Sequence, residues 1–83
     1  MTGSIRAELL HEIGRLSRMR ERIIHSSLAS AHKFALRTAG EILEFAANNE
    51  GELTSAQVEE LLEDAQELEQ FAKFRLAKWS DRE

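Results

Sequence analysis

Cysteine, proline and tyrosine are absent from this chain of 83 residues, and glycine occurs only four times. Without cysteine the chain cannot form a disulfide, and no group of residues has the spacing of a structural zinc site. A domain of this size buries only about 60% of the surface that its unfolded chain exposes, so its margin of stability is thin. Because disulfides and metals are excluded as supports, we expect self-association to stabilise the fold.

The lack of proline and the shortage of glycine also indicate the fold class. Both residues interrupt helices, whereas the leucine, alanine, glutamate and arginine that dominate here favour them. No apolar run approaches the ~18 residues of a membrane span, and no charged segment followed by an unbroken apolar one opens the chain. We therefore expect one all-α domain over residues 1–83, located in the cytoplasm and without contact with a membrane.

The clearest local signal is a helix start. Thr54 and Gln57 have the spacing of a capping box, in which each side chain accepts a hydrogen bond from the backbone N–H of the other residue. Just upstream, residues 48–51 read Asn-Asn-Glu-Gly, which tolerate a left-handed backbone and end helices. The sequence therefore predicts a turn at 48–53 and a helix over about 55–79.

Apolar residues recur every three or four positions along this second helix and give it one apolar face. Arg75 interrupts that face. We expect its aliphatic stem to pack there while the guanidinium reaches an edge or a carboxylate.

The N-terminal half carries a longer apolar stripe. From Ile5 to Phe45 the apolar residues stay near one azimuth when each residue advances by about 100°. A broken chain would normally lose this phase, so the stripe favours one helix over about 4–48, of the order of 65 Å long. The alternative is a three-helix bundle broken near 25–30, a serine-rich segment without glycine, proline, asparagine or aspartate. The favoured fold is therefore a helical hairpin.

The hairpin in turn predicts the assembly. A second helix of about 25 residues is too short to cover so long a first helix. The apolar stripe near the N-terminus would stay bare, which a soluble monomer does not tolerate. We therefore expect a homodimer, assembled as an antiparallel bundle. Its predicted self-interface comprises Ile5, Leu9, Ile13, Leu16, Met19, Ile23, Ser27 and Phe34.

Charge is segregated along the chain. The net charge is −4, yet residues 1–40 hold seven bases and three acids, whereas residues 41–83 hold four bases and twelve acids. The bases of the first half form a ridge opposite the apolar stripe. Such a ridge could bind nucleic acid weakly, but no aromatic residues interleave it to stack on bases. We expect it instead to meet the acidic half of another subunit. The ridge comprises His11, Arg15, Arg18, Arg22, His25, His32 and Lys33.

The acidic second half suggests a partner surface. The acidic residues of 41–69 cluster around the tip of the predicted hairpin. Like charges gathered there repel one another, and a basic partner would relieve that repulsion. This supports an alternative function, an acidic inhibitor of a nucleic-acid-handling protein, in the manner of small phage and bacterial accessory proteins. Apolar side chains off the apolar faces, or near the chain end, would add anchors. The candidate partner-binding residues are Leu36, Phe74, Trp79, Glu59, Glu60, Glu63, Asp64 and Glu67.

Nothing in the sequence has the pattern of an active site. Glu8 and His11 have the Glu-x-x-His spacing of di-iron bundles, but no second carboxylate helix accompanies them. There is no Gly-rich phosphate loop, no cysteine nucleophile and no Ser, His and acid set placed for catalysis. We therefore expect no enzyme activity, no metal and no cofactor. The predicted function is a small protein–protein interaction or adaptor module that self-associates through its long N-terminal helix.

Overall fold

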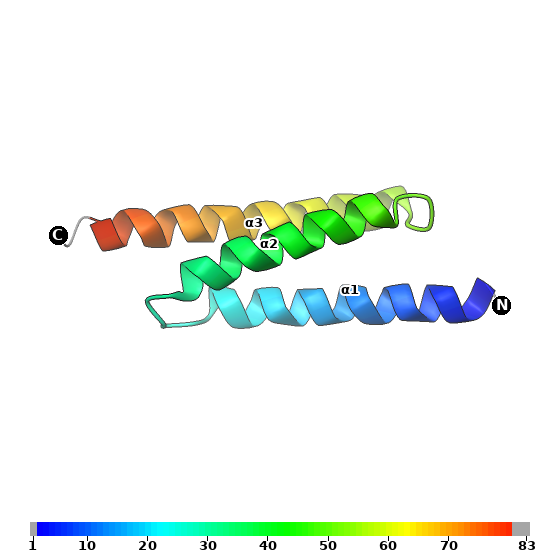
Figure 1. Ribbon diagram of the computed structural model, residues 1–83, viewed down its shortest axis with the longest axis horizontal. Coiled ribbons are helices and arrows are strands. Elements are labelled where there is room, and N and C mark those ends of the chain that lie inside the picture. Colours follow the sequence, from blue (N-terminus) through cyan, green and yellow to red (C-terminus); the bar gives the residue numbers. More distant parts are fainter. Residues whose placement is uncertain (1, 81–83) are drawn as a thin grey trace.

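The computed structural model describes the backbone of residues 2–80 and the side chains of residues 7–77. The described backbone contains helices and turns and no strand, which confirms the all-α fold class. The helices are α1 (Thr2–Ile24), α2 (Ala31–Asn48) and α3 (Ser55–Ser80) (Figure 1). Within these residues no helix combines the length and the apolar character needed to cross a membrane.

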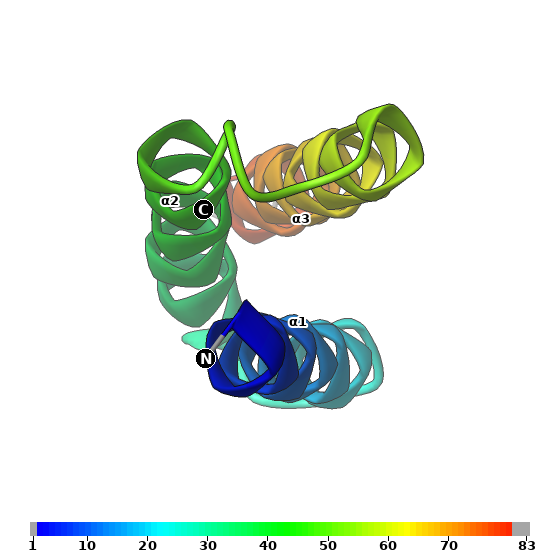
Figure 2. The same ribbon diagram turned by 90° about the vertical axis from the view of Figure 1, so that its right-hand side faces the viewer.

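The three helices form an elongated bundle of 55 × 18 × 16 Å. α2 runs antiparallel to both α1 and α3, so α1 and α3 point in the same direction (Figure 1). Viewed along the long axis, α1 and α3 lie on the same side of α2 (Figure 2). α2 packs mainly against α3, whereas α1 makes fewer contacts with either helix. α1 is therefore the most loosely attached of the three.

One apolar core joins the helices. α1 contributes Leu16 and Ile23, which α2 and α3 cover. Alanine dominates the buried positions of α2, and such small side chains let helix axes approach closely. The buried core cluster comprises Leu16, Ile23, Ala35, Ala39, Ile42, Ala46, Leu61, Ala65, Leu68 and Ala72.

The predicted continuous helix over 4–48 is wrong, because the chain reverses direction at residues 25–30. Serine supplies part of the reason. The Ser26 hydroxyl accepts a hydrogen bond from the backbone N–H of Leu28 at 3.2 Å. A serine side chain that bonds nearby backbone in this way offers the chain an alternative to the helix. The break lies where the alternative prediction of three helices put it.

A contact from α3 completes the turn. Arg75 donates from Nη2 to the backbone carbonyl of Ser26 at 2.6 Å, and its guanidinium lies 4.9 Å from the centre of the Phe71 ring. The side chain is partly buried, as expected, but its acceptor is a backbone carbonyl rather than a carboxylate. The donor comes from 49 residues further along the chain, so local sequence does not reveal it.

The second turn matches the sequence prediction. The backbone N–H of Thr54 donates to Gln57 Oε1 at 2.9 Å, and the N–H of Gln57 donates to Thr54 Oγ1 at 3.1 Å. These two bonds confirm the capping box. α2 ends differently from the prediction, because no described residue has a positive φ. Instead, the Asn49 side chain donates from Nδ2 to the Phe45 carbonyl at 2.9 Å. This carbonyl at the end of α2 thus has a hydrogen-bond donor without a left-handed residue.

The capping box yields a stability prediction. Thr54→Ala removes the acceptor for the Gln57 N–H and should lower the free energy of unfolding by about 1 kcal/mol. Thr54→Ser keeps the hydroxyl and should retain most of the stability. Urea unfolding followed by far-UV circular dichroism measures both variants. Equal stability of Thr54→Ala and the wild type would mean that the cap contributes nothing.

Candidate functional site

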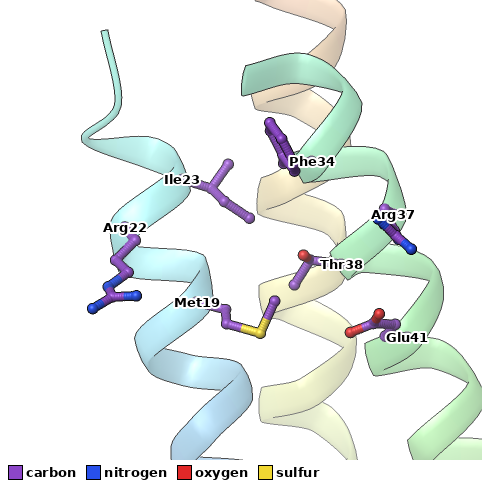
Figure 3. Close-up of a pocket in the computed structure, with 7 residues that line it drawn as sticks. All are labelled: Met19, Arg22, Ile23, Phe34, Arg37, Thr38 and Glu41. Atoms are coloured by element: carbon purple, nitrogen blue, oxygen red, sulfur yellow. The ribbon is translucent and has the colours of Figure 1, made fainter. Parts of the chain in front are cut away.

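A groove lined in large part by apolar side chains lies between α1 and α2. One part of it has a volume of about 350 Å³. Met19 and Ile23 on α1 and Phe34 on α2 point into the space between the two helices, with α3 behind them (Figure 3). Half of the Phe34 surface, 50%, remains exposed. The complete lining is Met19, Arg22, Ile23, Phe34, Arg37, Thr38 and Glu41.

Helical spacing explains why these side chains meet. Met19 and Ile23 are four residues apart, and so are Phe34 and Thr38, so each pair lies on one face of its helix. α2 begins beside α1 and inclines away from it toward its far end (Figure 1). Because the two helices diverge, their facing side chains do not close over one another.

Two arginines border this part of the groove. Arg22 lies on α1 and Arg37 on α2, both exposed, on the outer flanks of the apolar hollow (Figure 3). Within the described residues neither takes part in an ion pair. Both guanidiniums are therefore available to carboxylates of a ligand, the group that an arginine fork matches best.

The groove continues toward the far end of α2 with the opposite charge. A second hollow of about 330 Å³ shares Met19 and Glu41 with the first. Glu44 and Glu12 also line it, with Arg15 as its one base. Arg15 donates from Nε to Glu12 at 3.0 Å, and this hydrogen bond holds the pKa of Glu12 below its ordinary value. The groove is thus basic at one end and mainly acidic at the other.

Arg20 ties α1 to α3 and is a residue that the sequence analysis missed. Only 17% of its side chain is exposed. Its guanidinium contacts Glu21 at 2.9 Å, Glu67 at 3.0 Å and Asp64 at 3.3 Å. The Asp64 contact is an ion pair without hydrogen-bond geometry, which leaves Nε unsatisfied. Its position four residues after Leu16 places Arg20 on the apolar stripe, a signal that was present in the sequence.

The carboxylates around Arg20 outnumber it. Burial raises the pKa of Asp64 above its ordinary value; Arg20 opposes this effect, and Glu60, Glu67 and Glu63 add to it. The guanidinium of Arg20, which is shared among several carboxylates, does not offset the loss of water from the Asp64 carboxylate. The contact between α1 and α3 therefore carries excess negative charge.

The turn at 25–30 divides the predicted basic ridge. Four of its members lie exposed on α1, and three lie in the turn or on α2. Glu12 pairs with Arg15, and Glu21 lies 3.4 Å from His25, so carboxylates interrupt the ridge. The members on α1 are His11, Arg15, Arg18 and Arg22, and the others are His25, His32 and Lys33.

The predicted self-interface is partly inside the subunit. Leu16 and Ile23 are buried, and Ile13 packs against the same core. Met19 and Phe34 line the groove. The bare stripe that called for a second subunit is therefore covered along much of its length by α2 and α3. Leu9 is half-buried, Ser27 is exposed in the turn, and the side chain of Ile5 lies outside the described residues.

The predicted partner-binding residues are spread over two helices. Leu36 on α2 is 52% exposed and Phe74 on α3 is 66% exposed. The acidic candidates Glu59, Glu60, Glu63 and Glu67 are exposed and Asp64 is half-buried, while the side chain of Trp79 lies outside the described residues. Glu8 and His11 are both exposed. Among the side chains that the structure describes, no group of three or more His, Asp or Glu residues could hold a metal.

The raised pKa of Asp64 predicts a pH dependence. Between its ordinary value of 3.8 and its raised folded value, the folded state binds more protons than the unfolded state, so stability falls as pH rises through that window. Asp64→Asn should therefore be more stable than the wild type at pH 7, and this advantage should vanish as pH falls below the ordinary value. Urea unfolding at several pH values measures the difference.

The matched control is Glu59→Gln, which removes an exposed charge from the same helix and should change stability less. A loss of stability in Asp64→Asn at pH 7 would mean that the ion pair with Arg20 outweighs the burial of the carboxylate.

No family model, curated protein or solved structure matches this chain. Its function is therefore inferred from the groove between α1 and α2 and from the charges beside it.

Proposed function

We propose that this chain is a protein-binding module that receives an amphipathic helix of a partner protein in the groove between α1 and α2. One observation carries the proposal: an apolar hollow of about 350 Å³, with Phe34 half exposed, stays open between the helices. It is bordered by Arg22 and Arg37, neither of which has an ion pair among the side chains of residues 7–77. Helix-in-groove recognition places apolar anchors of the ligand in such a hollow.

Charge along the groove selects the ligand further. Near Phe34 the unpaired arginines favour carboxylates, and toward the other end Glu41 and Glu44 favour basic side chains. The ligand is thus an amphipathic helix with one large apolar anchor, acidic side chains beside the anchor and basic side chains toward its other end.

A nucleic acid fits this groove less well. The carboxylates of Glu12, Glu41 and Glu44 line it and would repel phosphates. Glu12 also engages Arg15, one of the bases that a nucleic acid would need. The weak nucleic-acid binding that the sequence suggested therefore gains no support from this groove, which is not basic along its length.

Site-directed photocrosslinking in the native host tests the proposal. A benzophenone amino acid in place of Phe34 should crosslink a protein segment that has the composition of such an amphipathic helix. The same substitution at Phe74, an exposed aromatic position on α3, is the control and should not capture that segment. Crosslinks from position 34 to nucleic acid alone would overturn the proposal, and capture of a basic protein from position 74 alone would favour the acidic-inhibitor hypothesis instead.

A synthetic peptide of the captured segment then gives the affinity. Phe34→Ser removes the wall that the anchor packs against and should weaken binding by roughly tenfold to a hundredfold, the range of about 1.4–2.8 kcal/mol typical of an interface anchor. Arg22→Glu should weaken it and make binding less sensitive to salt. Isothermal titration calorimetry measures both variants, with Phe74→Ser as the control. Unchanged affinity in Phe34→Ser would show that the peptide binds elsewhere.

A further inference from the structure

The outer face of α2 carries a second apolar surface that is separate from the groove. Leu36, Gly40, Leu43 and Ala47 are spaced by four, three and four residues, which puts them on one face of the helix. All four are exposed. α1 and α3 both lie on one side of α2 and leave its other side without a covering helix (Figure 2).

Nothing within the subunit requires glycine at position 40. Gly40 lies in the middle of α2. Glycine is less favourable there than alanine, because its backbone loses more conformational entropy when the helix forms. Its φ is not positive, and a Cβ added there would have no atom within 4 Å. A glycine in the interior of a helix, beside open space and between two exposed leucines, is suited to close approach by a helix from outside.

We infer that α2 packs antiparallel against α2 of a second copy of this chain, about a two-fold axis that passes between residues 41 and 42. In this register Leu36 lies opposite the partner's Ala47, and Leu43 lies opposite the partner's Gly40. Each large side chain therefore meets a small one, the alternation that lets two packed helices interdigitate. The surface is complementary to itself, as a two-fold interface has to be.

The flanking charges agree with this register. Arg37 and Glu44 lie on the same side of the stripe, both exposed, and neither takes part in an ion pair within the described part of the chain. In the register set by this axis, the partner's Glu44 lies opposite position 39. Arg37 is therefore only two residues, or ~3 Å along the helix, away from it. Two reciprocal ion pairs follow. A parallel two-fold pairing would instead put Arg37 of one copy and Glu44 of the other on opposite flanks of the contact, and neither ion pair would form.

The apolar surface extends from α2 onto α3. Leu43 and Leu62 line a hollow of about 260 Å³ beside the stripe, together with Ala65, Gln66 and Glu69. Leu62 is itself exposed. A second copy would cover this hollow as well, so the contact is wider than one pair of helices. The inference does not rest on the proposed function, because its apolar residues lie on another flank of α2 than the groove. Arg37 and Glu44 border both surfaces.

Sedimentation equilibrium of the full chain, from micromolar to millimolar concentration, tests the inference. The wild type should show an equilibrium between the 9.5 kDa chain and a dimer of twice that mass. Leu43→Glu should raise the dimer dissociation constant by at least about tenfold, since it puts a charge at the centre of the contact. A wild type that stays monomeric throughout would overturn the inference.

Charge reversal tests the antiparallel register. Arg37→Glu and Glu44→Arg should each weaken the dimer, because each places like charges together across the axis. The double variant restores both pairs and should recover most of the affinity. Arg18→Glu, which reverses an exposed arginine on α1, is the control and should leave the dimer unchanged. Failure of the double variant to recover affinity would exclude this register.

Gly40→Ala separates a role in assembly from a role in the fold. Alanine meets open space within the subunit and favours the helix, so the Tm of the dilute monomer should rise. The same methyl group would take up the space into which the partner's Leu43 packs. The dimer dissociation constant should therefore also rise, by severalfold. A higher Tm with unchanged dimer affinity would show that Gly40 does not lie at the interface.

Discussion

The reversal of the chain at residues 25–30 is the constraint on which the rest of this structure depends. It turns α1 back along α2 and so buries Leu16 and Ile23 in the chain's own core. Two hydrogen bonds to Ser26 hold the turn. Its hydroxyl accepts from the backbone N–H of Leu28 in the same loop, and its backbone carbonyl accepts from Arg75 on α3. If residues 25–30 continued the helix, those apolar side chains would have no cover within the subunit.

The two halves of the bundle differ in how they are held. α2 and α3 pack closely through small side chains, whereas α1 is attached by a few apolar contacts and by Arg20. Arg20 faces several carboxylates, and burial, to which the neighbouring glutamates add, raises the pKa of Asp64 despite the opposing charge of Arg20. Part of the charge segregation read from the sequence is thus satisfied within the subunit, between the basic first helix and the acidic third.

α2 is central to both proposed surfaces. One flank forms the groove with α1, where Phe34 stays half exposed between Arg22 and Arg37. Its outer face carries alternating large and small residues around Gly40. A dimer formed through the stripe would carry one groove on each copy. It would therefore hold two ligands in a fixed relation, as an adaptor does. In these proposals the groove would select its ligand by charge polarity, whereas the stripe would select its partner by alternating side-chain size together with the charges of Arg37 and Glu44.

The sequence alone determined the helical class, the turn after Asn48 and the start of α3, because the signals for these features are local. The capping box of Thr54 and Gln57 lies within four residues and forms as predicted. Only the tertiary structure decided that the first half is two helices. The apolar stripe keeps its phase across residues 25–30, because α1 and α2 both turn an apolar face toward the same core. The turn at the break receives a hydrogen bond from a donor 49 residues away, which no neighbour in the chain reveals. The stripe position of Arg20 was present in the sequence, but its carboxylate partners on α3 were not.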